Sequence, residues 1–129
     1  MRRLPRQNQR SFEKMKVEST LTDNILYVRL QGDLIGSPDS QQLLDLVNSK
    51  LNDSVILCAV DLSKVRFINS SGIGVLVSLL TKFRNRGGEL VLINPSEHMR
   101  KLLIITKLNA IFTIAEDDVF AAKFLKESV

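Results

Sequence analysis

The chain has 129 residues, of which 44% are hydrophobic and 25% charged, so it suits one globular domain and is too apolar for a disordered chain. Cys58 is the single cysteine, which excludes an internal disulfide and favours a reducing compartment, and we therefore expect a cytoplasmic protein. The net charge is +4, and no apolar run approaches the ~20 residues of a membrane-spanning helix.

The N-terminal segment carries most of the positive charge. Through Lys16 it contains six basic residues and one acid, a charge of +5, so the rest of the chain carries −1. Its polar composition predicts a mobile basic tail over residues 1–14, followed by one domain over residues 15–129. Such a tail could contact nucleic acid, although Phe12 is its single aromatic residue for stacking on bases.

The spacing of apolar residues predicts strands and helices in alternation. Ile25 to Leu30 predicts a strand that ends in a loop at Gln31-Gly32-Asp33. Ser37-Pro38-Asp39 predicts the start of a helix, because serine can cap it and proline suits the first helical position. Val55 to Val60 is an unbroken apolar run closed by Asp61, which predicts a short buried strand.

A segment rich in serine and glycine, residues 65–74, joins this strand to a helix. The helical spacing of the apolar residues that follow places Ser70 or Ser71 at the N-cap or in the first turn, where either hydroxyl can cap a free N–H. Gly72 and Gly74 each cost a helix about 0.5–1 kcal/mol relative to alanine. They indicate that a strand packs closely on the helix or that an external group approaches its N-terminus.

The last third of the chain continues the alternation. Gly87-Gly88 predicts the end of the helix, and Glu89 to Ile93 predicts another strand. Asn94-Pro95-Ser96-Glu97 resembles a capping box, with the asparagine as cap and the proline at the first helical position. Phe112 to Ala115 predicts a last strand, and Asp117-Asp118 predicts the start of a terminal helix. The expected buried stripe of that helix is Val119, Phe120, Phe124 and Leu125.

This order of elements predicts the fold class. Strands separated by helices imply parallel neighbours joined by right-handed crossovers. We therefore expect a single α/β domain, with a mixed sheet of about five strands and about four helices that lie mainly on one side of it.

The chain resembles the anti-sigma factor antagonist family of STAS domains in the order of its elements and in its central motif. The resemblance covers about residues 16–126. It rests on Asp61-Leu62-Ser63, on Asn69-Ser70-Ser71-Gly72-Ile73-Gly74 and on Arg86-Gly87-Gly88-Glu89-Leu90. In that family the central stretch usually reads Asp-Ser-Ser-Gly-Leu-Gly, so this chain departs from it with an amide, Asn69, in place of an acid. The resemblance implies a STAS-like fold.

The same resemblance implies a partner and a switch. In the family a partner kinase phosphorylates the first serine of the motif, which corresponds to Ser70. The unmodified protein sequesters an anti-sigma factor of the histidine-kinase-like ATPase type and so frees a sigma factor, and a phosphatase acting on Ser70 would reset it. The partner-binding residues that the resemblance carries over are Asp33, Asn69, Ser71, Gly72, Ile73 and Gly74.

An enzyme would need chemistry that the sequence does not assemble. His98 is the only histidine, Cys58 has no evident base partner, and the acids are too scattered for a paired-carboxylate site. We therefore expect a binding protein rather than an enzyme, with no catalytic residue, metal site or cofactor. Two alternatives to the phosphorylation-switched module stay open. One is a STAS scaffold or transporter-associated subunit that phosphorylation does not switch, and the other is a basic-tailed nucleic-acid binder.

Overall fold

The computed structural model describes residues 14–36 and 39–129. The predicted basic tail falls almost entirely outside the described residues, as does the predicted helix start at Ser37-Pro38. In chain order the strands and helices are β1 (Lys16–Thr22), β2 (Ile25–Leu34), α1 (Asp39–Asn52), β3 (Leu57–Ile68), α2 (Ser70–Asn85), β4 (Glu89–Ile93), α3 (Glu97–Ile105), β5 (Thr113–Ala115) and α4 (Asp118–Glu127).

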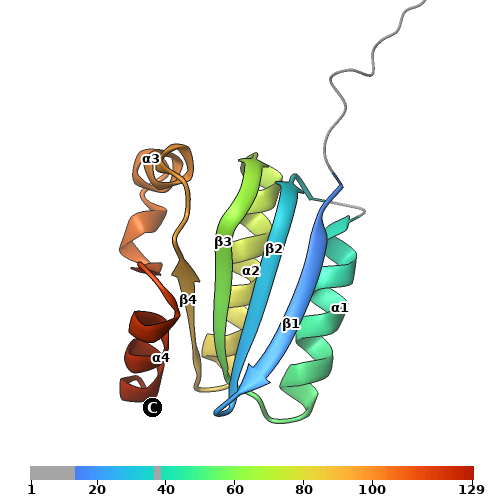
Figure 1. Cartoon of the computed structure of the whole chain (residues 1–129), viewed down its shortest axis with the longest axis vertical. Helices are drawn as coiled ribbons and strands as arrows, with labels where there is room; N and C mark the ends of the chain where they lie inside the picture. Colours follow the sequence, from blue (N-terminus) through green and yellow to red (C-terminus); the bar gives the residue numbers. More distant parts are fainter. Residues whose placement is uncertain (1–13, 37–38) are drawn as a thin grey trace, which may run out of the picture.

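Within the described residues, five strands form one mixed sheet in the order β1-β2-β3-β4-β5 (Figure 1). β1 runs antiparallel to β2, and the other three neighbouring pairs are parallel. Parallel strands need a crossover connection, and the helices between β2, β3, β4 and β5 supply it. The mixed sheet and the order of elements predicted from the sequence are confirmed.

The strands send alternate side chains into two cores, one on each face of the sheet. In β2, Leu26 and Val28 enter a larger core to which α1, α2 and α3 contribute, whereas Ile25 and Tyr27 enter a smaller core with α4. The helices therefore lie mainly on one side, as expected. Since α4 covers only part of the second face, polar stretches of β1, β2 and β3 stay open there.

Two strands continue beyond their predicted ends. β2 runs through Gln31-Gly32-Asp33, where the sequence predicts a loop, and β3 runs past Asp61 to Ile68. In these extensions most side chains of β3 are exposed, so the apolar pattern stops although the backbone pairing continues. The pairing of β2 with β3 is also irregular at two points, which shifts the alternation that would reveal a strand.

The capping box predicted at Asn94-Pro95-Ser96-Glu97 is wrong by two residues. Ser96 is the N-cap of α3, because its hydroxyl oxygen accepts a hydrogen bond from the N–H of Met99 at 3.1 Å. Asn94 instead directly follows β4, and its N–H donates to the carbonyl of Ala115 in β5 at 2.8 Å. The helix therefore begins only at Glu97, after the proline.

The buried stripe predicted for α4 is also partly wrong. Val119 and Phe120 are 79% and 51% exposed, whereas Ala121 and Leu125 are fully buried against the sheet. Residues four apart share a helix face, so Ala121 and Leu125 face the sheet together. Val119 and Phe120, which precede Ala121, then point toward solvent. The sequence shows that the helix is amphipathic but not which of two adjacent stripes faces the sheet.

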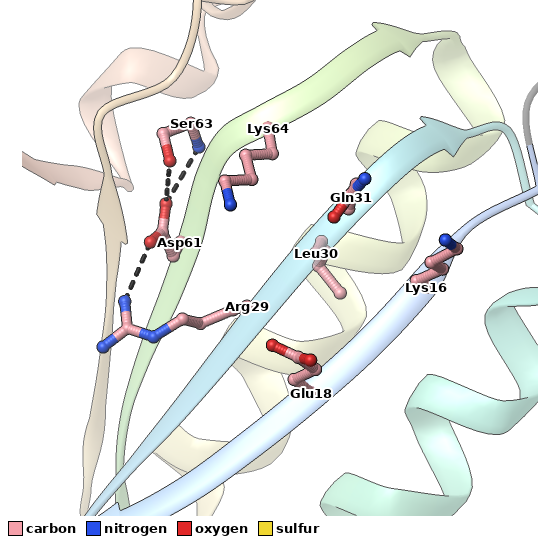
Figure 2. A pocket seen from close by; sticks show the side chains of 8 residues that line it. All are labelled: Lys16, Glu18, Arg29, Leu30, Gln31, Asp61, Ser63 and Lys64. Carbon is pink, nitrogen blue, oxygen red and sulfur yellow. Dashed lines mark hydrogen bonds and ion pairs between the residues drawn. The ribbon is translucent and has the colours of Figure 1, made fainter.

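Arg29 of β2 ties α4 to the sheet. Its guanidinium bonds Asp61 of β3 (Nη1–Oδ2 2.8 Å) and Asp118 of α4 (Nη2–Oδ2 2.7 Å). Asp61 also accepts hydrogen bonds from the N–H and the hydroxyl of Ser63 (Figure 2). Burial alone would raise the pKa of Asp61, but the hydrogen bonds from Ser63 and Arg29 outweigh burial and hold that pKa below its usual value.

Replacing Asp61 by asparagine should lower stability more near neutral pH than in acid. A carboxylate whose native pKa is depressed stabilises the fold above its unfolded pKa, about 3.9, and this contribution is lost as the pH falls through the native pKa. Urea unfolding of the parent and of Asp61→Asn at about pH 6.5 and about pH 3 measures the effect. A free-energy gap of the same size at both pH values would contradict this role of Asp61.

Candidate functional site

The corner between β3 and α2 is capped by Asn69. This residue is extended (φ −120°), and its side-chain oxygen accepts a hydrogen bond from the N–H of Gly72 at 2.9 Å. The interpretation that Ser70 or Ser71 caps the helix is therefore wrong, although both serines do lie in the first turn. An asparagine caps a helix as well as an aspartate does, so the amide at this position keeps the geometry and removes one negative charge.

Both serines of the motif are exposed. Ser70 is the first residue of α2 and Ser71 the second, and the first turn contains no acidic residue. Ser71 lies beside Gly36, where an added Cβ would lie 3.0 Å from the Cβ of Ser71, and its side chain is exposed. An oxyanion on Ser70 would thus stand at the positive end of a 16-residue helix, without a neighbouring carboxylate in that turn.

The two glycines of the motif have different roles. Gly72 is buried, and a Cβ added there would overlap the carbonyl oxygen of Leu34 at the end of β2. Gly74 is exposed, and nothing lies within 4 Å of a Cβ added there. Of the two explanations that the sequence leaves open, close packing of a strand applies to Gly72, whereas Gly74 meets no such packing and the approach of an external group there stays a prediction.

Two of the carried-over contact residues do not present their side chains to solvent. Ile73 is only 6% exposed and belongs to the larger core, so it supports the corner from beneath rather than offering an apolar contact. The side chain of Asp33 is fully buried and forms a two-pronged ion pair with Arg66 (Nη2–Oδ2 2.8 Å, Nε–Oδ1 3.0 Å). In this conformation neither side chain is exposed for a contact with a partner, and their role in partner binding stays a prediction.

The structure adds two surface residues that sequence reasoning did not select, Arg66 and Phe67. The side chain of Arg66 is 57% exposed although Asp33 fixes its guanidinium, and Phe67 is 41% exposed. They lie at the end of β3, directly before the capped corner. A phenylalanine in a strand is normally assigned to the core, so its exposure becomes visible only once the pairing of β3 is known.

No group of three histidine, cysteine or acidic side chains among the described residues could hold a metal ion. Burial raises the pKa of the Cys58 thiol and so keeps it protonated. In the part of the chain that the structure describes, no helix has the length and apolarity to cross a membrane. The corner exposes two hydroxyls, a glycine, a guanidinium held by Asp33 and a partly exposed aromatic ring.

Comparison with known proteins agrees with this architecture. A family model of the STAS domain matches residues 16–121. A Listeria monocytogenes protein named anti-sigma-B factor antagonist is 30% identical over 101 residues, which are 78% of this chain and 86% of that protein. The crystal structure of an anti-sigma factor antagonist from Mycobacterium paratuberculosis superposes with a TM-score of 0.75 at 19% identity, covering 87% of this chain and 94% of that one.

A further solved structure is similar in fold. The phosphorylated form of the Bacillus cell fate determinant SpoIIAA superposes with a TM-score of 0.67 at 20% identity, covering 85% of this chain and 98% of that one. The family model spans most of the chain, and the Listeria relative adds sequence identity over most of the same region. The chain therefore belongs to the STAS domain family.

Proposed function

We propose that this protein is a cytoplasmic anti-sigma factor antagonist, a binding protein that sequesters an anti-sigma factor kinase of the histidine-kinase-like ATPase type and so frees a sigma factor. Phosphorylation of Ser70 by that kinase ends the binding, and a phosphatase restores it. The single observation that carries the proposal is the exposure of Ser70 at the start of α2, beside a surface that Gly74 leaves bare. The names of the relatives support it.

The position of Ser70 explains how a phosphate could act without refolding the domain. A phosphoserine carries about −1.5 to −2 charges at neutral pH. The N-terminus of a helix favours an anion by roughly 0.3–1 kcal/mol, and Asn69 caps this one without adding a second negative charge. The monomer therefore tolerates the phosphate. A partner that docks on this corner must remove water from the phosphate, which weakens binding unless the partner supplies cations.

The departure at Asn69 fits this mechanism. An aspartate at the cap would stand three residues from Gly72 with the same hydrogen bond, but it would repel a phosphate on the adjacent Ser70. The neutral amide keeps the cap and removes the repulsion. Loss of the acid therefore alters the charge that the kinase meets and leaves the shape of the corner as it is.

We expect the kinase to modify Ser70 and not Ser71. Ser70 is the first helical residue and corresponds to the serine that is modified in the resembled family, whereas Ser71, also exposed, lies beside Gly36. Mass spectrometry of Ser70→Ala and Ser71→Ala after incubation with an ATPase-type anti-sigma factor and ATP tests this. Phosphate should disappear from Ser70→Ala and persist on Ser71→Ala.

The opposite pattern would assign the modification to Ser71. Absence of phosphate from the parent and from both variants, with binding to the anti-sigma factor intact, would favour an unswitched STAS module. Because both side chains are exposed and neither caps α2, the two alanine variants should fold equally well, and circular dichroism checks this.

A further inference from the structure

The face of the sheet opposite α1 and α2 contains a hollow of about 150 Å³. Side chains of β1, β2 and β3 line it, beside the part of the face that α4 covers (Figure 2). The hollow lies across the sheet from α2 and so has no part in the corner at Ser70. Its polar lining needs an explanation, because the smaller core under α4 on the same face is apolar.

Three hydrogen-bond donors stand in one row across the hollow. Gln31 of β2 is the register partner of Lys16 in β1 and of Lys64 in β3, and all three line the same hollow. Neighbouring strands lie about 4.8 Å apart, so the two lysine Cα atoms are about 10 Å apart with the amide between them. Figure 2 shows Lys16 and Lys64 on either side of Gln31. Within residues 14–36 and 39–129, none of these three side chains has a hydrogen-bond or ion-pair partner.

The next row in the hollow consists of two acidic residues and an arginine whose charge is already paired. Arg29 lies between Glu18 and Asp61, but its charge is already engaged by Asp61 and by Asp118 of α4. This ion-pair cluster gives the hollow a fixed wall, since Asp61 is held in turn by Ser63. Glu18 has no such partner among the described residues. The hollow is therefore positive along one row and negative at the end where Glu18 stands.

We propose that this hollow binds a small oxyanion, the phosphate or carboxylate group of a metabolite, between Lys16 and Lys64 and over the amide of Gln31. Two ammonium groups supply opposite charge from both sides, and the amide N–H₂ supplies a directed hydrogen bond to a ligand oxygen. The bound group must be small, because the hollow is small and Glu18 repels negative charge placed one row further. This site is independent of the proposed function.

Inorganic phosphate is the first probe. We expect a saturable shift of the amide signals of Lys16, Gln31 and Lys64 in ¹H–¹⁵N spectra of the full chain, with chloride used to hold the ionic strength constant. Lys64→Gln should weaken the affinity about five-fold, because it removes one unit charge close to the ligand. Glu18→Gln should strengthen it about two-fold, since it removes a repulsion from further away. Titration with malonate in parallel shows whether a phosphate or a dicarboxylate binds more tightly.

A matched control separates this site from general attraction to a basic protein. Lys101 of α3 is exposed and lies away from the hollow, so Lys101→Gln should leave the affinity unchanged. All substituted residues are exposed, and circular dichroism confirms that each variant is folded. The proposal is overturned if neither probe gives saturable shifts, if Lys64→Gln and Lys101→Gln act alike, or if the shifts gather at residues 70–74 instead of the sheet.

Discussion

Replacing Gly72 by alanine should lower the midpoint of thermal unfolding by about 10 °C or more. The new methyl group would overlap the carbonyl oxygen of Leu34 and press on the side chain of Ile68. A backbone carbonyl in a paired strand cannot move aside as a flexible side chain can, so α2 must shift away from the sheet and lose contacts of the larger core. Overpacking of this kind costs about 3 kcal/mol. For a domain of this size, each kcal/mol corresponds to about 4 °C.

Gly74→Ala is the matched control, two residues further along the same helix. Nothing lies within 4 Å of its added Cβ, so the variant should gain about 0.5–1 kcal/mol from the better helix propensity of alanine. Calorimetry of both variants tests the pair. Equal midpoints for Gly72→Ala and Gly74→Ala would mean that β2 does not approach α2 as closely as described, and the contrast between the two glycines would then be wrong.

These glycines show what sequence reasoning could and could not resolve at the site. The cost of two glycines near the start of a helix indicates an unusual surface, and the motif locates it. The sequence does not assign close packing to one glycine and bare surface to the other, because the carbonyl that decides it belongs to Leu34, 38 residues earlier in the chain. The same limit hid the pair formed by Asp33 and Arg66, since the register of β2 with β3 is irregular at that point.

The fold could be predicted from the sequence better than the site, because the spacing of apolar residues is a local signal. Each buried strand and each amphipathic helix leaves its pattern within a few residues, and the order of these patterns is enough to predict a mixed sheet with crossovers. Errors arose where tertiary contacts override local signals. Asn94 resembles a cap but pairs with β5, and Val119 resembles a buried residue but faces solvent because Ala121 faces the sheet.

Replacing Ser70 by aspartate should leave the fold intact and weaken binding to an ATPase-type anti-sigma factor about 30-fold or more. The carboxylate stands at the first position of α2, where the helix dipole favours it, so stability should change little. At an interface the same charge must lose its water. An uncompensated buried charge costs about 2 kcal/mol or more, which corresponds to this loss of affinity. Aspartate carries one charge where phosphate carries nearly two, so the variant underestimates the natural switch.

Gly74→Val tests the same surface by shape instead of charge. The added side chain meets no protein atom within 4 Å of its Cβ, so the domain should remain folded, but it would stand between the corner and a partner that docks there. Isothermal titration calorimetry with the anti-sigma factor measures the affinity, and circular dichroism of each variant reports folding. Weaker binding by both variants would locate the partner at the start of α2, whereas tight binding by Gly74→Val would place its contacts elsewhere on the corner.

Ser96→Asp controls for charge alone. Ser96 is exposed and caps α3, and aspartate is an equally good N-cap, so this variant puts the same carboxylate at the start of a different helix. It should bind like the parent, because Ser96 begins α3 after β4 and is not part of the corner between β3 and α2. An equal loss of affinity in both aspartate variants would point to net charge as the cause. If folded Ser70→Asp binds as tightly as the parent chain, the corner is not the switch, and a STAS module that phosphorylation does not control becomes the better account.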